Sequence, residues 1–399
     1  MSRQNVIDIE NLSMARTYWK RPLVINRGKG AILWDINGKE YIDCTGNYGV
    51  AIVGHAHPKV VEAIKAQAEK LTSCHGTFYS EARSKFLEKL VALAPRGLER
   101  AFLSNSGAES VEFALKIARR STGRKEIIAM MGAFHGKTMG ALSATWNKKY
   151  RHPFEPLVPG FKHVSFGKIE NIEKAISDET AAVITEAIQG ESGVRVPPDD
   201  FLPALRELCD EREILLIVDE VQTGFGRTGR MFACEHWGIE PDILCLAKAV
   251  ANGLPMGVTM TKGEIMSSLQ VGEHSSTFGG GPLACAAAAA TIDVLLGEKL
   301  PERAARLGNN LMERLEGSKE KYKIIREVRG LGLMIGLELR FDILNILLML
   351  LDRGILMLDA GRNVMRFLPP LVIEEAQLDR VVSVLEEVLG EEEDAKLRR

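Results

Sequence analysis

The stretch from Ile214 to Lys248 places the strongest limit on how this chain can fold. It opens with the apolar run Ile214–Val218, which is rich in β-branched residues and predicts a fully buried strand. A carboxylate, Asp219, follows this run at once. A second short apolar run, Ile243–Leu246, is followed in the same way by Ala247 and Lys248. A carboxylate and a lysine therefore each stand where a buried strand is expected to stop.

The positions of Asp219 and Lys248 indicate a particular chemistry. In open α/β sheets, ligands bind outside the carboxyl ends of the strands. An acid and a lysine delivered there from neighbouring strands suggest pyridoxal phosphate (PLP), because the amine can form a Schiff base while the carboxylate keeps the pyridine nitrogen protonated. A lysine after a strand is more often a solvated strand end, so the pair alone leaves both interpretations open.

The glycines between the two strands suggest a competing ligand. The run from Gly224 to Gly229, GFGRTG, matches the G-x-G-x-x-G pattern of dinucleotide sites. That pattern requires a helix to open at the third glycine, whereas Arg230–Cys234 shows no clear helical start. The acidic residue also precedes the glycines instead of following them. The dinucleotide interpretation is therefore the weaker of the two.

Composition restricts the class of protein and its compartment. The chain has 399 residues, of which 46% are hydrophobic and 26% charged, and its formal net charge of −2 implies no general attraction to nucleic acid. Its six cysteines form no C-x-x-C pair, which favours free thiols in a reducing compartment. The N-terminus lacks an apolar core of signal-peptide length, and the apolar stretch Ile343–Leu351 is too short to cross a bilayer. We expect a cytoplasmic protein.

The order of patterns along the chain predicts an α/β architecture with a second, smaller part. Between Phe78 and Ala290, helical and strand patterns alternate, as in a parallel α/β sheet. After about residue 295, helical stretches enclose alternating strands at Gly332–Glu338 and Val364–Leu368, and Glu391–Arg399 resembles a frayed charged tail. The predicted division is residues 1–45, an N-terminal segment that joins the small domain; residues 46–295, a large cofactor-binding domain; and residues 296–399, a small C-terminal α+β domain.

Other strand ends carry candidate site residues. The predicted strand Arg100–Leu103 leads into Ser106, Gly107 and Ala108 at the start of a helix, where free N–H groups and the helix dipole can bind an anion. Ser106 and Glu109 also fit a capping box, and both interpretations can hold at once.

Two further candidates follow the next strands. Phe134 stands in a glycine-bounded turn, where it either stacks on a planar cofactor or packs in the core. The pair His55 and His57 resembles a metal motif, but no third ligand stands nearby and Pro58 favours a helix start, so we assign no metal site.

In this order, the motifs resemble those of the class III (subgroup II) aminotransferases among the fold-type I PLP enzymes. The match extends over nearly the whole chain, and the run from Asp219 to Gly229 is its most specific part. The matching stretches are Asn105–Glu109, Phe134–Thr138, Glu186–Glu191, Asp219–Gly229, Leu246–Lys248 and Thr277–Gly280. The resemblance implies a PLP-dependent transaminase with a large domain built on a mainly parallel seven-stranded sheet and a small α+β domain.

The resemblance also implies roles for individual residues. Lys248 would bond the cofactor and move a proton, and Asp219 would lie under the pyridine nitrogen; these are the two implied catalytic residues. The implied cofactor-binding residues are Ser106, Gly107, Ala108, Phe134, Glu186, Asp219, Val221, Gln222, Lys248 and Thr277. Because Thr277 matches a ligand that reaches the phosphate bound by the partner subunit, a homodimer is expected.

Glu191 and Arg366 resemble a gating pair. In such a pair, the arginine is held by the glutamate in one half-reaction and binds the α-carboxylate of glutamate in the other. The implied common substrates are therefore glutamate and 2-oxoglutarate.

Some positions depart from the family pattern or bear on the substrate. Lys137 stands where these enzymes usually have an arginine for the substrate carboxylate, and a lysine lacks the bidentate fork. Tyr48 occupies a position where ornithine aminotransferases carry tyrosine and enzymes for α-blocked substrates often carry an apolar residue, while Tyr18 falls near another substrate-contacting tyrosine. The candidate substrate-binding residues are thus Lys137, Glu191, Arg366, Tyr48 and Tyr18.

Three stretches narrow the resemblance to one group. Thr145–Pro156, Val328–Gly336 and Arg366–Pro370 are similar to the archaeal-type transaminases of lysine and arginine biosynthesis, in the acetylornithine/acetyl-lysine aminotransferase group. Those enzymes act on aminoadipate or glutamate semialdehyde tethered to a small acidic carrier protein, LysW. The resemblance implies an ω-aminotransferase that moves an amino group between glutamate/2-oxoglutarate and the terminal carbon of a carrier-linked lysine or ornithine precursor.

Several alternatives to this function remain. N-Acetylornithine is the nearest alternative substrate, followed by free ornithine or 4-aminobutyrate. A PLP aminomutase or racemase is less favoured, because it has no need of a pair like Glu191 and Arg366. The basic residues Lys148, Lys149, Arg151 and His152 suggest a docking surface for the acidic carrier, although a solvated basic loop explains them equally well.

Overall fold

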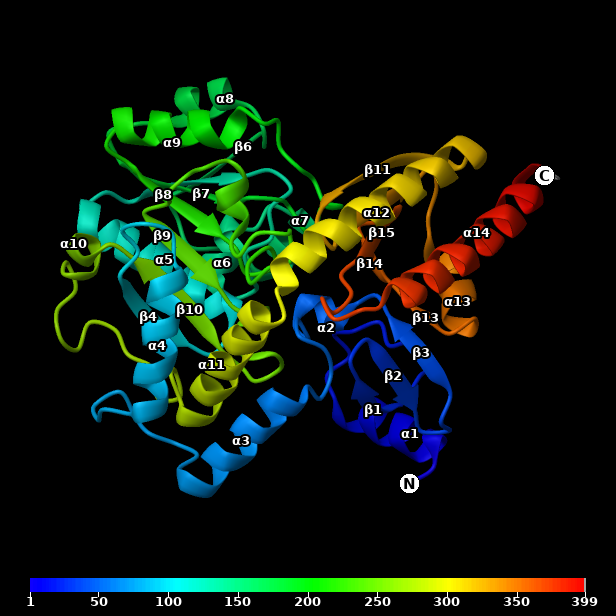
Figure 1. Ribbon diagram of the computed structural model, residues 1–399. Coiled ribbons are helices and arrows are strands. Elements are labelled where there is room, and N and C mark those ends of the chain that lie inside the picture. Colours follow the sequence, from blue (N-terminus) through cyan, green and yellow to red (C-terminus); the bar gives the residue numbers. More distant parts are fainter. Residues whose placement is uncertain (398–399) are drawn as a thin grey trace.

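The computed structural model describes residues 1–397, and its largest feature is a seven-stranded sheet (Figure 1). The strands are β4 (Arg100–Ser104), β5 (Glu126–Met130), β6 (Phe161–Val164), β7 (Thr180–Glu186), β8 (Leu215–Asp219), β9 (Ile243–Leu246) and β10 (Gly257–Thr261). Their order is β4-β10-β9-β8-β7-β5-β6. All pairings are parallel except those of β10, which runs antiparallel to both β4 and β9. The predicted mainly parallel seven-stranded sheet is confirmed.

The central strands are buried on both faces, as their continuous apolar runs predicted. Every residue of β7 and β9 is buried. Successive residues of β8 enter different cores: Ile217 packs with the cluster under helix α5 (Gly107–Thr122), whereas Val218 joins the larger cluster on the opposite face, which includes α9 (Phe201–Glu211) and α11 (Pro282–Gly297). Successive side chains of a strand point to opposite faces of the sheet, so a sheet that is covered on both faces requires apolar residues at consecutive positions.

Two four-stranded sheets form the rest of the framework. Their strands are β1 (Ile25–Lys29), β2 (Ile32–Asp35), β3 (Glu40–Asp43), β11 (Ile325–Leu331), β12 (Met334–Leu339), β13 (Ile355–Leu356), β14 (Leu358–Ala360) and β15 (Val364–Phe367). One sheet has the order β1-β2-β3-β13 and the other β11-β12-β15-β14. The hairpin predicted at Asn37 and Gly38 joins β2 to β3. Because β13 pairs with β3, the first strands of the chain share a sheet with a segment more than 300 residues later.

Helices surround these sheets and connect them. The remaining ones are α1 (Arg3–Ser13), α2 (Gly46–Gly49), α3 (Pro58–Lys70), α4 (Glu81–Leu93), α6 (Met139–Ala144), α7 (Lys148–Arg151), α8 (Ile169–Ala175), α10 (Gly263–Met266), α12 (Leu300–Lys321), α13 (Leu344–Asp352) and α14 (Glu375–Leu397). Helix α12 runs from the side of the large sheet across to the smaller sheets (Figure 1). Within residues 1–397, no helix is both long and apolar enough to cross a membrane. The domain boundaries at residues 45 and 295 stay a prediction.

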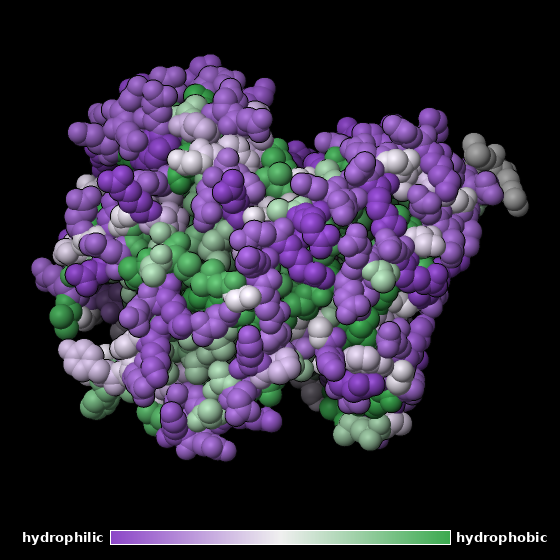
Figure 2. Space-filling view, in the orientation of Figure 1, coloured by the Kyte–Doolittle hydropathy of each residue, from purple (hydrophilic) through white to green (hydrophobic). Residues whose placement is uncertain are grey.

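The surface in this view is mainly hydrophilic. Figure 2 shows hydrophilic residues over most of this face, with hydrophobic residues gathered near its centre around α11. That helix is rich in alanine, and only part of it is buried.

The prediction of a frayed tail from Glu391 is wrong for the described residues, because α14 continues to Leu397. Its charged side chains bind earlier elements: Arg353 donates to both carboxylate oxygens of Glu391 at 2.6 and 2.8 Å. The backbone N–H of Ile324 donates to Glu393 at 3.2 Å. These contacts hold in place a segment whose charge alone suggested disorder. Residues 398 and 399 of the predicted tail lie outside the described part of the chain.

A close approach at Gly308 fixes α12 against the rest of the molecule. A Cβ added to Gly308 would lie only 2.1 Å from the carbonyl oxygen of Gly332. Gly332 has a φ of +54° and itself packs against the backbone of Thr228, in the loop that follows β8. A glycine at position 308 therefore lets the helix, this loop and the turn before β12 come into contact.

This contact generates a stability prediction. Gly308→Ala should lower the free energy of unfolding by about 1–3 kcal/mol, because backbone atoms must shift to admit the methyl group. Gly317→Ala is the matched control: it lies in the same helix, nothing lies within 4 Å of its added Cβ, and it should raise stability by about 0.5–1 kcal/mol. Urea unfolding midpoints of the two variants and the unmodified protein test this. Midpoints that move in the same direction for both variants would contradict it.

Candidate active site

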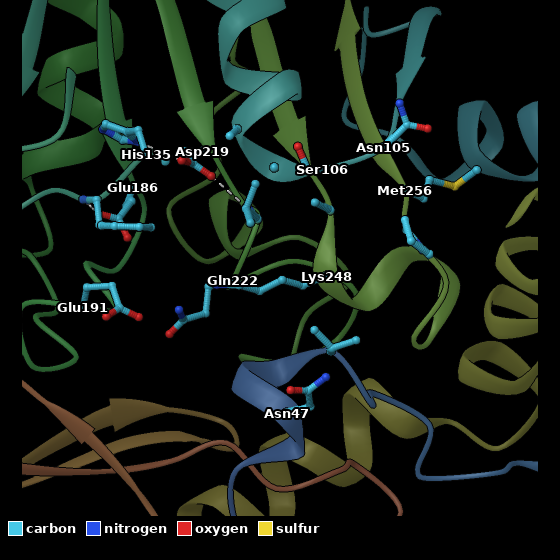
Figure 3. A pocket seen from close by; sticks show the side chains of 18 of the residues that line it. Asn47, Asn105, Ser106, His135, Glu186, Glu191, Asp219, Gln222, Lys248 and Met256 are labelled. Atoms are coloured by element: carbon cyan, nitrogen blue, oxygen red, sulfur yellow. Dashed lines mark hydrogen bonds and ion pairs between the residues drawn. The ribbon is translucent and has the colours of Figure 1, made fainter. Parts of the chain in front are cut away.

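The register of three parallel strands brings the predicted catalytic residues to one edge of the large sheet. Glu186 at the end of β7 is paired with Asp219 at the end of β8, and Asp219 is paired with Cys245 on β9. Lys248 follows the end of β9. Glu186, Asp219 and Lys248 all line one cavity of about 420 Å³. Figure 3 shows the Lys248 side chain extending into this cavity, with Asn47 of α2 approaching from the other side.

Lys248 is held in an uncommon backbone conformation. Its φ is +39°, in the left-handed region that residues other than glycine rarely adopt. Such strain is typical of functional sites, where the surrounding fold over-determines the backbone. Burial lowers the pKa of the Lys248 amine, and the negative charge of Glu191 opposes this shift in part. The environment thus favours the neutral, proton-accepting amine more than water does.

Asp219 is held by two hydrogen bonds. It is 4% exposed, and its Oδ2 lies 2.7 Å from Nδ1 of His135, while its Oδ1 accepts the N–H of Val221 at 3.0 Å. Burial disfavours the charged form of His135, yet the hydrogen bond and the negative charge of Asp219 raise the pKa of the imidazole overall. A proton on Nδ1 therefore stabilises the Asp219 carboxylate. His135 was not predicted as a site residue; the only signal in the sequence is its position next to Phe134, in the turn after a strand.

Glu186 connects two loops at the same edge. Its carboxylate accepts the N–H of Phe134 at 3.1 Å and the N–H of Gly190 at 3.1 Å. Burial raises the pKa of Glu186 to about 7. The carboxylate thus fixes the turn that carries the Phe134 ring, which lines the cavity and contacts Tyr150 edge-on with ring centroids 5.8 Å apart.

The opposite end of the cavity is the N-terminus of α5. Ser106 is the N-cap and accepts the N–H of Glu109 at 3.2 Å, as predicted, but the Glu109 carboxylate accepts the N–H of Asn105 at 2.6 Å and not that of Ser106, so only half of the predicted capping box is present. The N–H groups of Gly107 and Ala108 have no protein acceptor among the described residues, and both residues line the cavity. Free N–H groups at the positive end of a 16-residue helix can bind a phosphate.

The cavity as a whole fits PLP. It offers anion-binding N–H groups at one end, a buried carboxylate and a lysine amine. Gly107 is required by close packing, since an added Cβ would lie 2.8 Å from a methyl group of Val221. Val221 and Phe134 supply apolar surface suitable for the two faces of a planar ring. Lys248 would hold the cofactor covalently and Asp219 would face its ring nitrogen.

A buried ion pair lies at the wall of the cavity. Arg366 on β15 is 0% exposed, and its Nη1 donates to Glu191 at 2.8 Å and to the side-chain oxygen of Gln222 at 3.1 Å. Its Nη2 donates to the carbonyl oxygen of Asp359 at 3.2 Å. Burial favours the neutral acid, but the nearby charge of Arg366 holds the pKa of Glu191 below its usual value. The structure thus joins the two residues of the predicted gating pair.

Five predicted residues do not line this cavity, and the first of them, Arg366, contacts its wall through Glu191 and Gln222. Thr277 is exposed on a loop and does not line it. Lys137 is also exposed, with its amine 4.8 Å from the centroid of the Tyr150 ring. Tyr18 and Tyr48, which are 72% and 49% exposed, line an adjoining cavity of about 950 Å³ instead.

The two alternative motifs have structural partners of their own. His55 Nε2 lies 2.6 Å from Asp43, and His57 Nε2 lies 3.4 Å from Glu298, so the two rings do not converge. In the part of the chain that is described, no cluster of three or more acidic, histidine or cysteine side chains could hold a metal ion. No helix opens at Gly229, as a dinucleotide site would require.

A further carboxylate next to the site stabilises the glycine-rich loop. Glu220 is 1% exposed and accepts the backbone N–H groups of Ala233 at 2.6 Å and Cys234 at 2.8 Å, together with the hydroxyl of Thr223 at 3.2 Å. Burial raises the pKa of Glu220 to about 7. These bonds close the loop between β8 and the 3-10 turn at residues 233–236.

Comparison with known proteins extends these observations. The family model described as aminotransferase class-III matches residues 13–389. Acetylornithine aminotransferase of Methanocaldococcus jannaschii is 48% identical over 98% of this chain and 99% of its own, and the [LysW]-aminoadipate semialdehyde transaminase of Deinococcus radiodurans is 44% identical over 96% and 90%. A solved structure of ornithine aminotransferase from Toxoplasma gondii, described as showing partial occupancy of PLP at its active site, superposes with a TM-score of 0.95 at 34% identity, over 100% of this chain and 96% of that one.

The environment of Glu220 predicts a pH dependence of stability. In the folded protein this group keeps its proton up to about pH 7, whereas in the unfolded chain it loses the proton near 4.5, so its contribution to stability falls as the pH rises between these values. Glu220→Gln cannot ionise, and between pH 5 and pH 7.5 it should gain about 1–3 kcal/mol relative to the unmodified protein. Urea unfolding of both proteins without PLP at the two pH values measures this. A constant difference between them would contradict it.

Proposed function

The chain belongs to the class-III aminotransferases, which are PLP-dependent transaminases, and from this membership we propose that it transfers the terminal amino group of an ornithine- or lysine-like amino acid to 2-oxoglutarate, forming glutamate, in lysine or arginine biosynthesis. The single observation that supports the two-substrate assignment best is the 2.8 Å ion pair of Arg366 with Glu191, because Glu191 lines the cavity that contains Lys248.

The ion pair allows one site to bind two substrates that differ in the group next to the reacting nitrogen. Glutamate carries a carboxylate next to its reacting nitrogen, whereas an ω-amino donor carries only a methylene there. A buried arginine that faced the methylene without a partner would be strongly unfavourable. Glu191 can neutralise Arg366 while the donor is bound and release it for glutamate. An aminomutase or racemase, which does not exchange with glutamate, has no use for such a pair.

The residues of the site can perform distinct tasks in this reaction. PLP, when bound, supplies the group that accepts the amino nitrogen and a ring that withdraws electrons from the reacting carbon. Lys248 Nζ, whose pKa is lowered by burial, can take a proton from the carbon that bears the nitrogen. Asp219, which is oriented by His135, would pair with the ring nitrogen. The N–H groups of the α5 N-terminus would hold the phosphate.

We further propose that the donor carries an acylated α-nitrogen. The names of two of the relatives support this, since one is an acetylornithine aminotransferase and the other acts on a LysW-linked semialdehyde. N-Acetylornithine and a carrier-linked lysine or ornithine precursor are the two candidates. Free ornithine is the alternative that Tyr48 supports, because a half-exposed phenol beside the site could contact a polar head group.

A carrier protein would need a docking surface near the entrance. Lys148, Lys149 and His152 are exposed on α7 and the following turn, and Tyr150 in the same helix contacts Phe134 in the cavity wall. Basic residues at this place would attract an acidic partner toward the entrance. We also propose a homodimer, in which Thr277 reaches the cofactor phosphate of the partner subunit; its exposed position outside the cavity of its own chain supports this.

The proposed reaction can be tested one half at a time. The PLP-loaded protein should lose its cofactor absorbance band rapidly with N-acetylornithine or carrier-linked lysine or ornithine, and slowly with 4-aminobutyrate. Lys248→Ala should lower overall transamination by about 10³-fold or more, because the proton acceptor is lost. Lys59→Ala, an exposed helical lysine, is the control and should change nothing. Rapid reaction with free ornithine alone would disprove the acylated donor, and unchanged turnover in Lys248→Ala would disprove the assigned role.

The carrier candidate has a separate test. Reversing the charges of Lys148, Lys149 and Arg151 to glutamate should lower kcat/KM for a carrier-linked donor by about 10-fold or more at low salt, because steering of an acidic partner is lost. The rate with N-acetylornithine, which needs no docking, should stay within about twofold. Equal rates with the carrier-linked donor in the variant and the unmodified protein would eliminate this surface.

A further inference from the structure

We propose that Arg21 is a second carboxylate-binding residue of the active site, which holds the carboxylate of the amino donor in the cavity that adjoins the catalytic one. This inference rests on the proposed function, since it names the residue that recognises the donor of that reaction.

The adjoining cavity, called the vestibule below, shares one lining residue with the catalytic cavity. It has a volume of about 950 Å³ and is lined by Tyr18, Arg21, Tyr48 and Asp359, among others. Asn47 lines both cavities, so the two spaces meet at α2. Asn47 and Tyr48 have φ values of +53° and +58°, and this strained pair forms the boundary between the two spaces. A donor with its terminal nitrogen at Lys248 can therefore extend its other end into the vestibule.

Arg21 presents unused hydrogen-bond donors to this space. A guanidinium group has five N–H donors, and among the described residues Arg21 uses only Nη2, which donates to the carbonyl oxygen of Met357. No carboxylate of the described chain lies within ion-pairing distance of it. Burial lowers the pKa of Arg21, which reflects partial removal of the group from water, while the negative charge of Asp359 opposes this shift. A partly desolvated guanidinium with free donors suits bidentate binding of a carboxylate.

The other cationic groups that line the vestibule already have partners, as do the nearby Arg366 and Lys137. In each case a carboxylate or an aromatic ring lies next to the charge. Arg366 binds Glu191, Lys20 binds Glu10, His55 binds Asp43, Arg27 lies 3.9 Å above the Trp34 ring, and Lys137 lies over the Tyr150 ring. Arg21 is thus the cation of the vestibule that remains available to a ligand within the described part of the chain.

This arrangement assigns one arginine to each half-reaction. Arg366 binds the carboxylate next to the reacting nitrogen of glutamate, and Arg21 binds the carboxylate at the far end of the donor. That carboxylate is present whether the α-nitrogen of the donor is free, acetylated or joined to a carrier, so the role of Arg21 does not depend on which donor is used. The negative charge of Asp359 opposes the positive charge of Arg21, so net charge alone attracts the donor only weakly. Recognition of the donor carboxylate therefore depends on its direct contact with Arg21.

The test compares each donor with its decarboxylated analogue. N-Acetylornithine is paired with N-acetyl-1,4-diaminobutane, and ornithine with 1,4-diaminobutane, and single half-reactions of the PLP-loaded protein are followed by absorbance. The unmodified protein should favour the carboxylated member of the pair that it uses, and Arg21→Gln should reduce this preference by about 10- to 100-fold, the effect of losing a charged hydrogen bond. Arg21→Lys should restore part of it.

Two controls separate recognition from general damage. Arg27→Gln removes another vestibule arginine, which already lies on a ring, and should leave the preference unchanged. The half-reaction of Arg21→Gln with glutamate should also be unchanged, which shows that the variant is folded and binds PLP.

Equilibrium binding keeps the inference testable if the proposed reaction fails. N-Acetylnorvaline has the same carboxylate but no terminal amine, and calorimetry should show at least about 10-fold weaker binding to Arg21→Gln than to the unmodified protein. Equal binding and an unchanged carboxylate preference in Arg21→Gln would overturn the inference while leaving the proposed function standing. Weaker binding without transamination of any ω-amino donor by the unmodified protein would support Arg21 and refute the proposed function.

Discussion

The active site depends first on the register of β7, β8 and β9. Because these strands are parallel and pair Glu186 with Asp219 and Asp219 with Cys245, their carboxyl ends meet at one edge of the sheet. The residues that follow the strands, including Lys248, are therefore placed at this same edge. A shift of one residue in any of these pairings would exchange the two faces of the strand and turn its core residues away from their clusters. The packing of the apolar runs therefore sets the geometry of the proposed catalytic groups.

Because the charged side chains at this edge of the sheet are buried, they depend on partner groups for their stability. Asp219 is stabilised by His135, Glu186 by two backbone N–H groups, and Arg366 by Glu191. Isolated ions in such surroundings would be neutralised or would destabilise the fold. The partners do more than compensate, because each one fixes the orientation of a group that is expected to contact cofactor or substrate. Stability and preorganisation are here two consequences of the same hydrogen bonds.

The proposed substrate-binding side is assembled from segments that are far apart in the chain. Arg366 and Asp359 come from β15 and β14, Asn47 and Tyr48 from α2, and Arg21 from the segment before β1. The parallel pairing of β13 with β3 holds the N-terminal strands, which lie between the Arg21 segment and α2 in the chain, next to the strand that directly precedes β14. Variation in this part can change the donor without disturbing the strand ends that hold the cofactor-binding groups.

The sequence by itself determined the elements and the family. The apolar runs before Asp219 and Lys248, the turn at Asn37 and the long motif from Asp219 to Gly229 are local patterns, and local patterns are enough to predict buried strands, a hairpin and a class of enzyme. Only the tertiary structure decided which side chains meet: His135 with Asp219, Arg21 with the vestibule, and Arg353 with a helix whose charges had suggested a frayed tail. These pairs join residues that are distant in sequence. Their distances follow from how the elements pack, which the spacing of residues along one segment does not encode.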